Sequence, residues 1–154
     1  EKANNQDIIL VEGGVYQGPF IINKSVHLIG TGRPILDGGG KGTVIKFSAP
    51  NSVLKGFLIR NSGDILSRDD AGVYATGKNI LIEDNHLEDV LFGIYLGRAP
   101  DSVIRKNVLR SKSVTVARRG DLIRIWYSDR IAIEQNRVFE GRDSVVWYSK
   151  DSII

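Results

Sequence analysis

Apolar and polar residues alternate in short runs along most of this chain. In "ILIEDNHLED", residues 80–89, Ile80 and Ile82 are separated by a single residue, and Leu87 follows after a break of Asp and Asn. Successive side chains of a β-strand point to opposite faces, so this period of two predicts strands of only a few residues. No segment keeps the 3.6-residue period of an amphipathic helix. The pattern therefore predicts an all-β chain.

The strand pattern itself repeats. The unit around Asn85 returns around Asn107 and once more around Asn136. A similar unit precedes Ile80, and in it Phe57 takes the place of the Asn. Units of about 21–22 residues with two or three short strands each are typical of one coil of a parallel β-helix. Equivalent residues of successive coils would then lie above one another.

Three Asn residues mark the same position of successive units. Asn85, Asn107 and Asn136 fall where one strand must bend into the next. Asn tolerates the left-handed backbone conformation that such a corner needs, and stacked amides can bond along the ladder. We interpret these residues as a structural ladder rather than as ligands.

An aromatic pair also repeats, because Trp126 and Tyr127 recur one unit later as Trp147 and Tyr148. Alternate strand residues point to opposite faces, so one ladder is expected inside and the other outside. The inner ladder would be ordinary core. The outer ladder could bind sugar rings or a protein partner, and the pattern leaves open which ladder this is.

Composition narrows the chemistry. The chain has 154 residues, no Cys and no Met, which excludes disulfides and thiolate metal sites within it. The net charge of +3 gives no reason to expect a nucleic-acid partner. No apolar run reaches the roughly 20 residues of a membrane span, so no membrane insertion is expected. The glycine-rich "LDGGGKGTVIKF" lacks phosphate-loop spacing and is predicted to be a turn between strands.

One domain is predicted over residues 1–154. Residues 1–24 are expected to supply an N-terminal cap and the first strands, because the end of a β-helix exposes unpaired strand edges. Residues 25–154 would form the stacked coils. No cap is visible near the C-terminus, so we expect the chain to be an excerpt of a longer protein, its signal peptide not included.

Two coils are longer than the others, with loops predicted at residues 62–72 and 111–121 on the same face. These loops and the strand that follows the second one supply the candidate binding groove: Asp69, Asp70, Arg118, Arg119, Asp121, Arg124 and Trp126. Loops carried by a rigid solenoid commonly bind ligands. The alternative is that the charges are solvated loop tips joined by weak salt bridges.

Neither a catalytic site nor a metal site is predicted. Asp69 and Asp70 are the adjacent carboxylates of the groove, but neighbouring strand residues point apart, which makes them a poor acid–base couple. His27 and His86 should both face solvent and lie several coils apart, so one metal ion could not use both. The chain is interpreted as a non-enzyme, and its alternative as an enzyme would be a carbohydrate lyase or hydrolase.

Longer motifs resemble one known family. "NSGDILSRDDAGVYATGKNILIEDNHLEDVLFGIYL" and "ARRGDLIRIWYSDR" followed by "GRDSVVWYS" resemble NosD, the maturation protein of nitrous oxide reductase. The resemblance implies a right-handed parallel β-helix of the pectin-lyase-like, carbohydrate-binding and sugar-hydrolase type. It implies a periplasmic or extracellular location, and partnership with an ABC transporter and a copper chaperone. Copper would be handled by the full-length protein, with no cofactor in this segment, and the resemblance carries over no catalytic residue.

Three functions stay open at this point. The first is a non-catalytic NosD-type scaffold that assists assembly of the copper–sulfur centre of nitrous oxide reductase. The second is a β-helix that binds or cleaves a polysaccharide in the groove between Asp70 and Arg119. The third is a purely structural repeat segment, for which charge changes at Arg118, Arg119 and Arg124 would have no effect.

Overall fold

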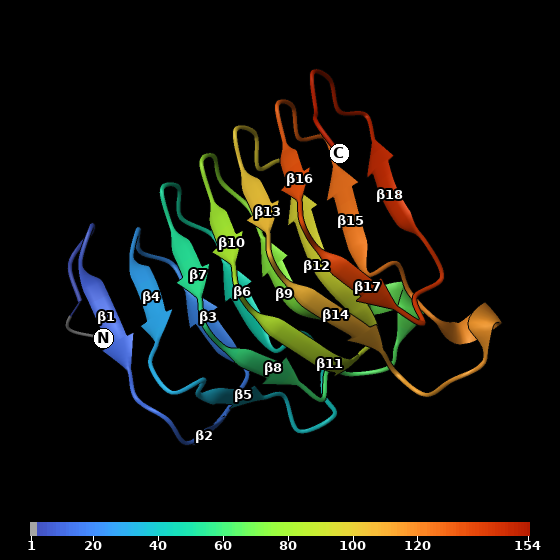
Figure 1. The fold of residues 1–154 in the computed structure, drawn as a ribbon, viewed down its shortest axis with the longest axis horizontal. Helices are drawn as coiled ribbons and strands as arrows, with labels where there is room; N and C mark the ends of the chain where they lie inside the picture. Colours follow the sequence, from blue (N-terminus) through green and yellow to red (C-terminus); the bar gives the residue numbers. More distant parts are fainter. Residues whose placement is uncertain (1–2) are drawn as a thin grey trace.

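The computed structural model describes residues 3–154, which form three parallel sheets of six short strands each (Figure 1). Sheet A contains, in order, β1(Ile8–Val11), β4(His27–Gly30), β7(Val53–Lys55), β10(Leu81–Glu83), β13(Val103–Arg105) and β16(Ala132–Glu134). Sheet B contains β2(Val15–Gln17), β5(Ile35–Asp37), β8(Leu58–Arg60), β11(His86–Val90), β14(Val108–Ser111) and β17(Arg137–Phe139). Sheet C contains β3(Phe20–Ile22), β6(Ile45–Phe47), β9(Ala71–Ala75), β12(Phe92–Gly97), β15(Ile123–Trp126) and β18(Ser144–Trp147).

The strands follow the chain in the order A, B, C and then return to A one level further along, so each set of three strands is one coil. The coils stack from the N-terminus at one end of Figure 1 to the C-terminus at the other. The prediction of an all-β parallel β-helix is confirmed, and the arrangement is consistent with the expected right-handed sense. Among residues 3–154, no helix combines the length and the apolar character that crossing a membrane requires.

The register of the sheets confirms the repeat read from the sequence. Leu54 pairs with Ile82, Ile82 with Ile104, and Ile104 with Ile133, which are the equivalent positions of successive units. The first three of these side chains are fully buried. Alternate residues of the strands thus point inward and stack into a continuous apolar core along the axis.

The corner between sheets A and B is built the same way in successive coils. Asn107 donates from Nδ2 to the Ile82 carbonyl at 2.9 Å and to Asn136 Oδ1 at 3.0 Å, and its own Oδ1 accepts from the Asn85 backbone N–H at 2.9 Å. The predicted ladder is confirmed. The expected backbone was wrong, because the left-handed residues are Asp84, Lys106 and Gln135, each one place before the Asn. The buried Asn then satisfies backbone groups that the turn leaves unpaired.

The corner between sheets B and C varies from coil to coil. Its connections span residues 18–19, 38–44, 61–70, 91, 112–122 and 140–143. The two longest carry short 3₁₀ helices, η1(Leu66–Arg68) and η2(Val116–Arg118). They overlap the loops predicted at 62–72 and 111–121, of which residues 71–72 and 111 belong to strands β9 and β14. Both loops leave the β-helix between sheets B and C, on the same face as predicted.

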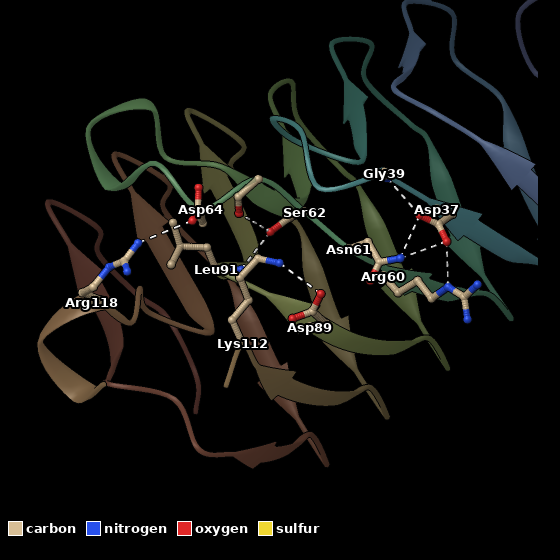
Figure 2. A network of polar contacts seen from close by, with 11 residues as sticks. Asp37, Gly39, Arg60, Asn61, Ser62, Asp64, Asp89, Leu91, Lys112 and Arg118 are labelled. Atoms are coloured by element: carbon tan, nitrogen blue, oxygen red, sulfur yellow. Dashed lines mark hydrogen bonds and ion pairs between the residues drawn. The ribbon is translucent and has the colours of Figure 1, made fainter. Parts of the chain in front are cut away.

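Figure 2 shows how neighbouring coils are joined near this variable corner. Asp37 accepts from Arg60 Nε at 2.8 Å, from Asn61 Nδ2 at 2.9 Å and from the Gly39 N–H at 2.9 Å. Burial raises the pKa of Asp37, but these hydrogen bonds and the Arg60 charge outweigh it and leave the pKa below its ordinary value. One carboxylate therefore ties the ends of two strands and the start of a loop.

Residues 8–22 form the first three strands, as predicted. Several apolar side chains on this first coil are exposed, among them Ile8 at 67% and Ile21 at 71%. The capping role expected for residues 1–24 stays a prediction, and residues 1–2 lie outside the described part of the chain.

Candidate functional site

The outer face of sheet C, which we call the sheet C face, concentrates aromatic and cationic side chains. In register across its strands, Lys46 lies beside Tyr74, Tyr74 beside Tyr95, and Tyr95 beside Arg124. Two residues further along the strand, Trp126 pairs with Trp147. Strand pairing holds these side chains at a spacing of about 4.8 Å per coil.

Arg124 is the centre of this face. Its Nη1 donates to Asp69 Oδ1 at 2.8 Å, so η1 and its left-handed end residue Asp69 lie against β15. The guanidinium lies over three aromatic rings, with centroid distances of 5.2 Å to Phe92, 4.9 Å to Tyr95 and 5.5 Å to Trp126. Planar guanidinium groups combine such stacking with charge pairing in a way that Lys does not. The site thus presents a fixed positive charge surrounded by rings.

The same surroundings act on Tyr95. Burial raises the pKa of its phenol; the Arg124 charge works in the opposite direction, and Asp69 adds to the rise. The net direction of the pKa is upward. The neutral phenol offers the face a hydroxyl donor.

Both aromatic ladders lie on the surface, so the expectation that one of them would be core is wrong. Tyr127 and Tyr148 stack at 4.6 Å with an 8° interplanar angle, and Trp126 lies 5.2 Å from Trp147. Tyr127 and Tyr148 adopt left-handed backbone angles just after their strands end. The simple alternation of faces stops there, and the Tyr side chains remain outside beside the Trp side chains. Trp147 is 53% exposed and Tyr148 is 65% exposed.

An open cavity of about 150 Å³ lies between Arg124, Trp126 and Trp147. Asp121 and Arg142 complete its polar wall, with Arg142 Nη2 3.1 Å from Asp121 Oδ1. Asp121 is almost fully buried, and its ion pair with Arg142 offsets the cost of removing the carboxylate from water. Four of the seven predicted groove residues, Asp69, Asp121, Arg124 and Trp126, thus meet around one place.

The other three predicted groove residues lie elsewhere. Asp70 is buried and accepts from the Ile65 N–H at 3.1 Å, which holds its own loop together. Arg119 donates to the carbonyls of Val114 at 2.8 Å and Glu140 at 2.9 Å. The side chains of Asp70 and Arg119 therefore stabilise the backbone of the loops through these hydrogen bonds.

Arg118 joins the two long loops. Its Nη2 lies 3.4 Å from Asp64 Oδ2, and both side chains are about 60% exposed. Figure 2 shows this contact reaching from one loop to the other. The binding role of the predicted groove stays a prediction. The expectation of solvated loop tips joined by a salt bridge describes this pair well.

Sequence reasoning missed part of the face. Phe92, Arg142, Tyr74 and Tyr95 were not among the residues predicted for the groove. For Tyr74 and Tyr95 the available signal was the repeat period, because residues that pair in register with Arg124 share its face. Phe92 is buried and Arg142 lies in the connection before β18, so the period gave no signal for either.

The described residues do not offer a donor set that fits copper. Among residues 3–154, no group of three or more His, Cys, Asp or Glu side chains is placed to hold a metal ion. His27 lies on β4 of sheet A and His86 on β11 of sheet B, and both are half-buried. Copper, expected from the resemblance for a longer protein, stays untested.

Comparisons with known proteins agree with this architecture. No family model matches the sequence. "Probable ABC transporter binding protein NosD" of Pseudomonas aeruginosa is 30% identical over 133 residues, which cover 84% of this chain and 31% of that protein. The chain thus spans less than a third of the length of this relative.

Two solved structures share the fold. Pectin methylesterase PemA from Erwinia chrysanthemi superposes with a TM-score of 0.60 at 14% identity, covering 86% of this chain and 47% of that one. A pectin methylesterase in complex with a hexasaccharide gives the same TM-score at 15% identity and the same coverage. At these identities the likeness establishes the β-helix fold alone.

Proposed function

Because this chain is a NosD-like parallel β-helix, we propose that it is an extracytoplasmic, non-catalytic scaffold that binds an ABC transporter. The longer protein would assist, with that transporter and a copper chaperone, in assembling the copper–sulfur centre of nitrous oxide reductase. The observation that carries this proposal is the likeness over 84% of the chain to a protein described as a probable ABC transporter binding protein.

The sheet C face supports a partner-binding role. Trp147, Tyr127 and Tyr148 are each about half or more exposed, next to the half-buried Trp126 and the fixed charge of Arg124. Trp, Tyr and Arg are the residues that most often dominate binding energy at protein interfaces. Their ring stacks and the Asp69 contact arrange them in advance, which lowers the entropy lost on binding.

Co-purification of the full-length protein with its transporter tests the scaffold function. We expect the wild type to be retained, and the Trp126→Ala, Trp147→Ala double variant to be lost or retained at least about tenfold less. Tyr16→Ala is the matched control, since Tyr16 is a 38% exposed aromatic residue on the first coil. If the full-length protein does not associate with the transporter in any nucleotide state, the proposal is contradicted. If Tyr16→Ala reduces retention as much as the double variant, the sheet C face is not the transporter-binding surface.

A second candidate is polysaccharide binding, because exposed aromatic stacks at coil spacing also suit the apolar faces of sugar rings. The discriminating experiment screens neutral and acidic polysaccharides for binding and for release of reducing ends. Binding that Trp147→Ala weakens would favour this candidate, and release of reducing ends would make it a lyase or hydrolase. If charge changes at Arg118, Arg119 and Arg124 alter neither association nor binding, the third hypothesis of a purely structural segment gains support.

A further inference from the structure

A second cavity opens at the N-terminal part of the sheet C face, at the level of the first three coils, where Pro19 and Ile21 form its apolar edge. Its volume is about 620 Å³, and Lys41, Lys46 and Arg68 line it together with Thr43 and Asp70. The three cations come from three separate elements: the 38–44 connection, β6 and η1. None of these cations belongs to the groove predicted from the sequence.

The three cations lack partners within the part of the chain that the structure describes. No ion pair or side-chain hydrogen bond of Lys41, Lys46 or Arg68 is present among residues 3–154. Other basic residues near the same corner, such as Arg60 and Arg124, are paired at 2.8 Å. One carboxylate, Asp70, shares the cavity, and its Oδ2 already accepts the Ile65 N–H. Three like charges thus face one partly engaged opposite charge, which leaves excess positive potential in the cavity.

The cavity wall is fixed rather than formed by loose loops. The Gly63 N–H donates to the Gly42 carbonyl at 2.8 Å, and the Gly40 N–H donates to the Asn61 carbonyl at 2.9 Å. These bonds fasten the 38–44 connection to the 61–70 loop in the next coil. A Cβ added at Gly63 would overlap Asp70 Oδ2 and the Gly42 nitrogen, so the junction requires glycine.

Thr43 adds a neutral donor to this wall. Its Oγ1 accepts the Ala71 N–H at 3.1 Å, and no acceptor for its own hydroxyl hydrogen is present within residues 3–154. A hydroxyl with its oxygen engaged can still donate. The cavity therefore combines two ammonium groups, one guanidinium group and one hydroxyl donor, which together match the acceptor oxygens of an oxyanion.

We propose that this cavity is a binding site for an oxyanion: a carboxylate, sulfate or phosphate group, free in solution or carried by an acidic polysaccharide. Lys41 and Lys46 supply charge, and the Arg68 guanidinium supplies a planar fork for two oxygens. Tyr74 lies beside Lys46 in register, so a ring that bears the anionic group can extend onto the aromatic part of the sheet C face. Lys46 lies on the sheet C face, but the functions proposed above rest on its C-terminal part, around Arg124, Trp126 and Trp147. The oxyanion site can therefore fail or hold independently of them.

Titration calorimetry of the whole chain tests the site, with sodium phosphate as the free oxyanion and polygalacturonate as the acidic polysaccharide. Lys46→Gln is expected to weaken binding of whichever probe binds about tenfold or more, because a hydrogen bond to a charged group is lost. Lys41→Gln is the second variant, and circular dichroism verifies that both variants fold. Neutral dextran should not bind.

Lys106→Gln is the matched control. It removes the same charge from an exposed corner, and Gln is already the residue at the equivalent position of the next coil, Gln135. Phosphate binding that only the cavity variants weaken supports a free-ion site, and polygalacturonate binding alone supports the polymer-borne group. Absence of binding by both probes, or equal weakening by Lys106→Gln, would overturn the proposal.

Discussion

The corner between sheets A and B and the corner between sheets B and C differ in how much their length varies along the β-helix. From the third coil onward, the corner between sheets A and B always takes two residues, a left-handed one followed by Phe57 or by an Asn of the ladder. The corner between sheets B and C takes anything from Leu91 alone to residues 112–122. The uniform corner sets the coil register. The variable corner is free to carry side chains that bind, because sheet hydrogen bonds hold the strands on both sides of it.

The largest expected effect of a mutation concerns the uniform corner. Asn107→Ala should lower the free energy of unfolding by about 3 kcal/mol, because several buried backbone and amide groups lose their partner at once. Urea denaturation measures this change. Glu88→Ala, on the outer side of β11, serves as the control and should change stability by less than about 0.5 kcal/mol. A cost for Asn107→Ala as small as that of the control would show that the ladder does not set the register.

An intermediate effect is expected where the variable corner is anchored. Asp37→Asn should cost about 2 kcal/mol at neutral pH, because the hydrogen bonds to Arg60 and Asn61 lose a charged acceptor. Urea denaturation of the variant and the wild type compares the two. If Asp37→Asn leaves the free energy of unfolding unchanged, the loops of this corner do not depend on the Asp37 hydrogen bonds.

The dependence on pH follows from the same contact. The pKa of Asp37 is lowered from 3.8 and that of Glu83 from 4.5. For Glu83, burial raises the pKa, and the contacts with Arg105 and Lys55 outweigh this rise. Because both folded-state values are depressed, the stabilisation is present above the ordinary values and is lost as the pH falls toward the folded values. The melting temperature should therefore drop below about pH 4, and less steeply in Asp37→Asn.

The smallest effect is expected at the loop tips. A double-mutant cycle on Arg118→Ala and Asp64→Ala should give a coupling of at most about 0.5 kcal/mol that vanishes at high salt, because both partners are mostly exposed. Thermal unfolding at two salt concentrations measures it. A coupling above about 2 kcal/mol would mean that the long loops stabilise the fold, which would weaken the contrast between the corners.

The repeat carried most of the fold prediction. Equivalent positions of successive units, such as Ile82 and Ile104, are the strand partners that the sheets contain, because stacked coils bring equivalent residues together. The backbone at the corners could not be read from residue preference. Lys106, Gln135 and Tyr127 are left-handed, although Asn would have been the expected choice. The left-handed turn at Tyr127 and Tyr148 ends the alternation of faces, and this is why the Trp and Tyr ladders share one side.

The candidate site was partly predictable for the same reason. Trp126 and Arg124 lie on regular strands, and their surroundings follow from register. Asp70, Arg119 and the cavity beside the 38–44 connection depend on loop backbone, where single hydrogen bonds decide which way a side chain turns. The sequence showed only a glycine-rich turn in this connection. Nothing in it indicated that the turn and the next loop join into one wall.

The paired Trp residues make the last two coils optically visible. Trp126 and Trp147 are the two Trp residues of the chain, one on β15 and one on β18, with ring centroids 5.2 Å apart at 40°. The transitions of two indole rings this close and inclined to each other couple. We therefore expect an exciton couplet, two bands of opposite sign, in the circular dichroism spectrum, which a single indole cannot give. The signal disappears when one coil moves away from the other. The molecule thus contains its own reporter for opening of the coil stack, with no added label.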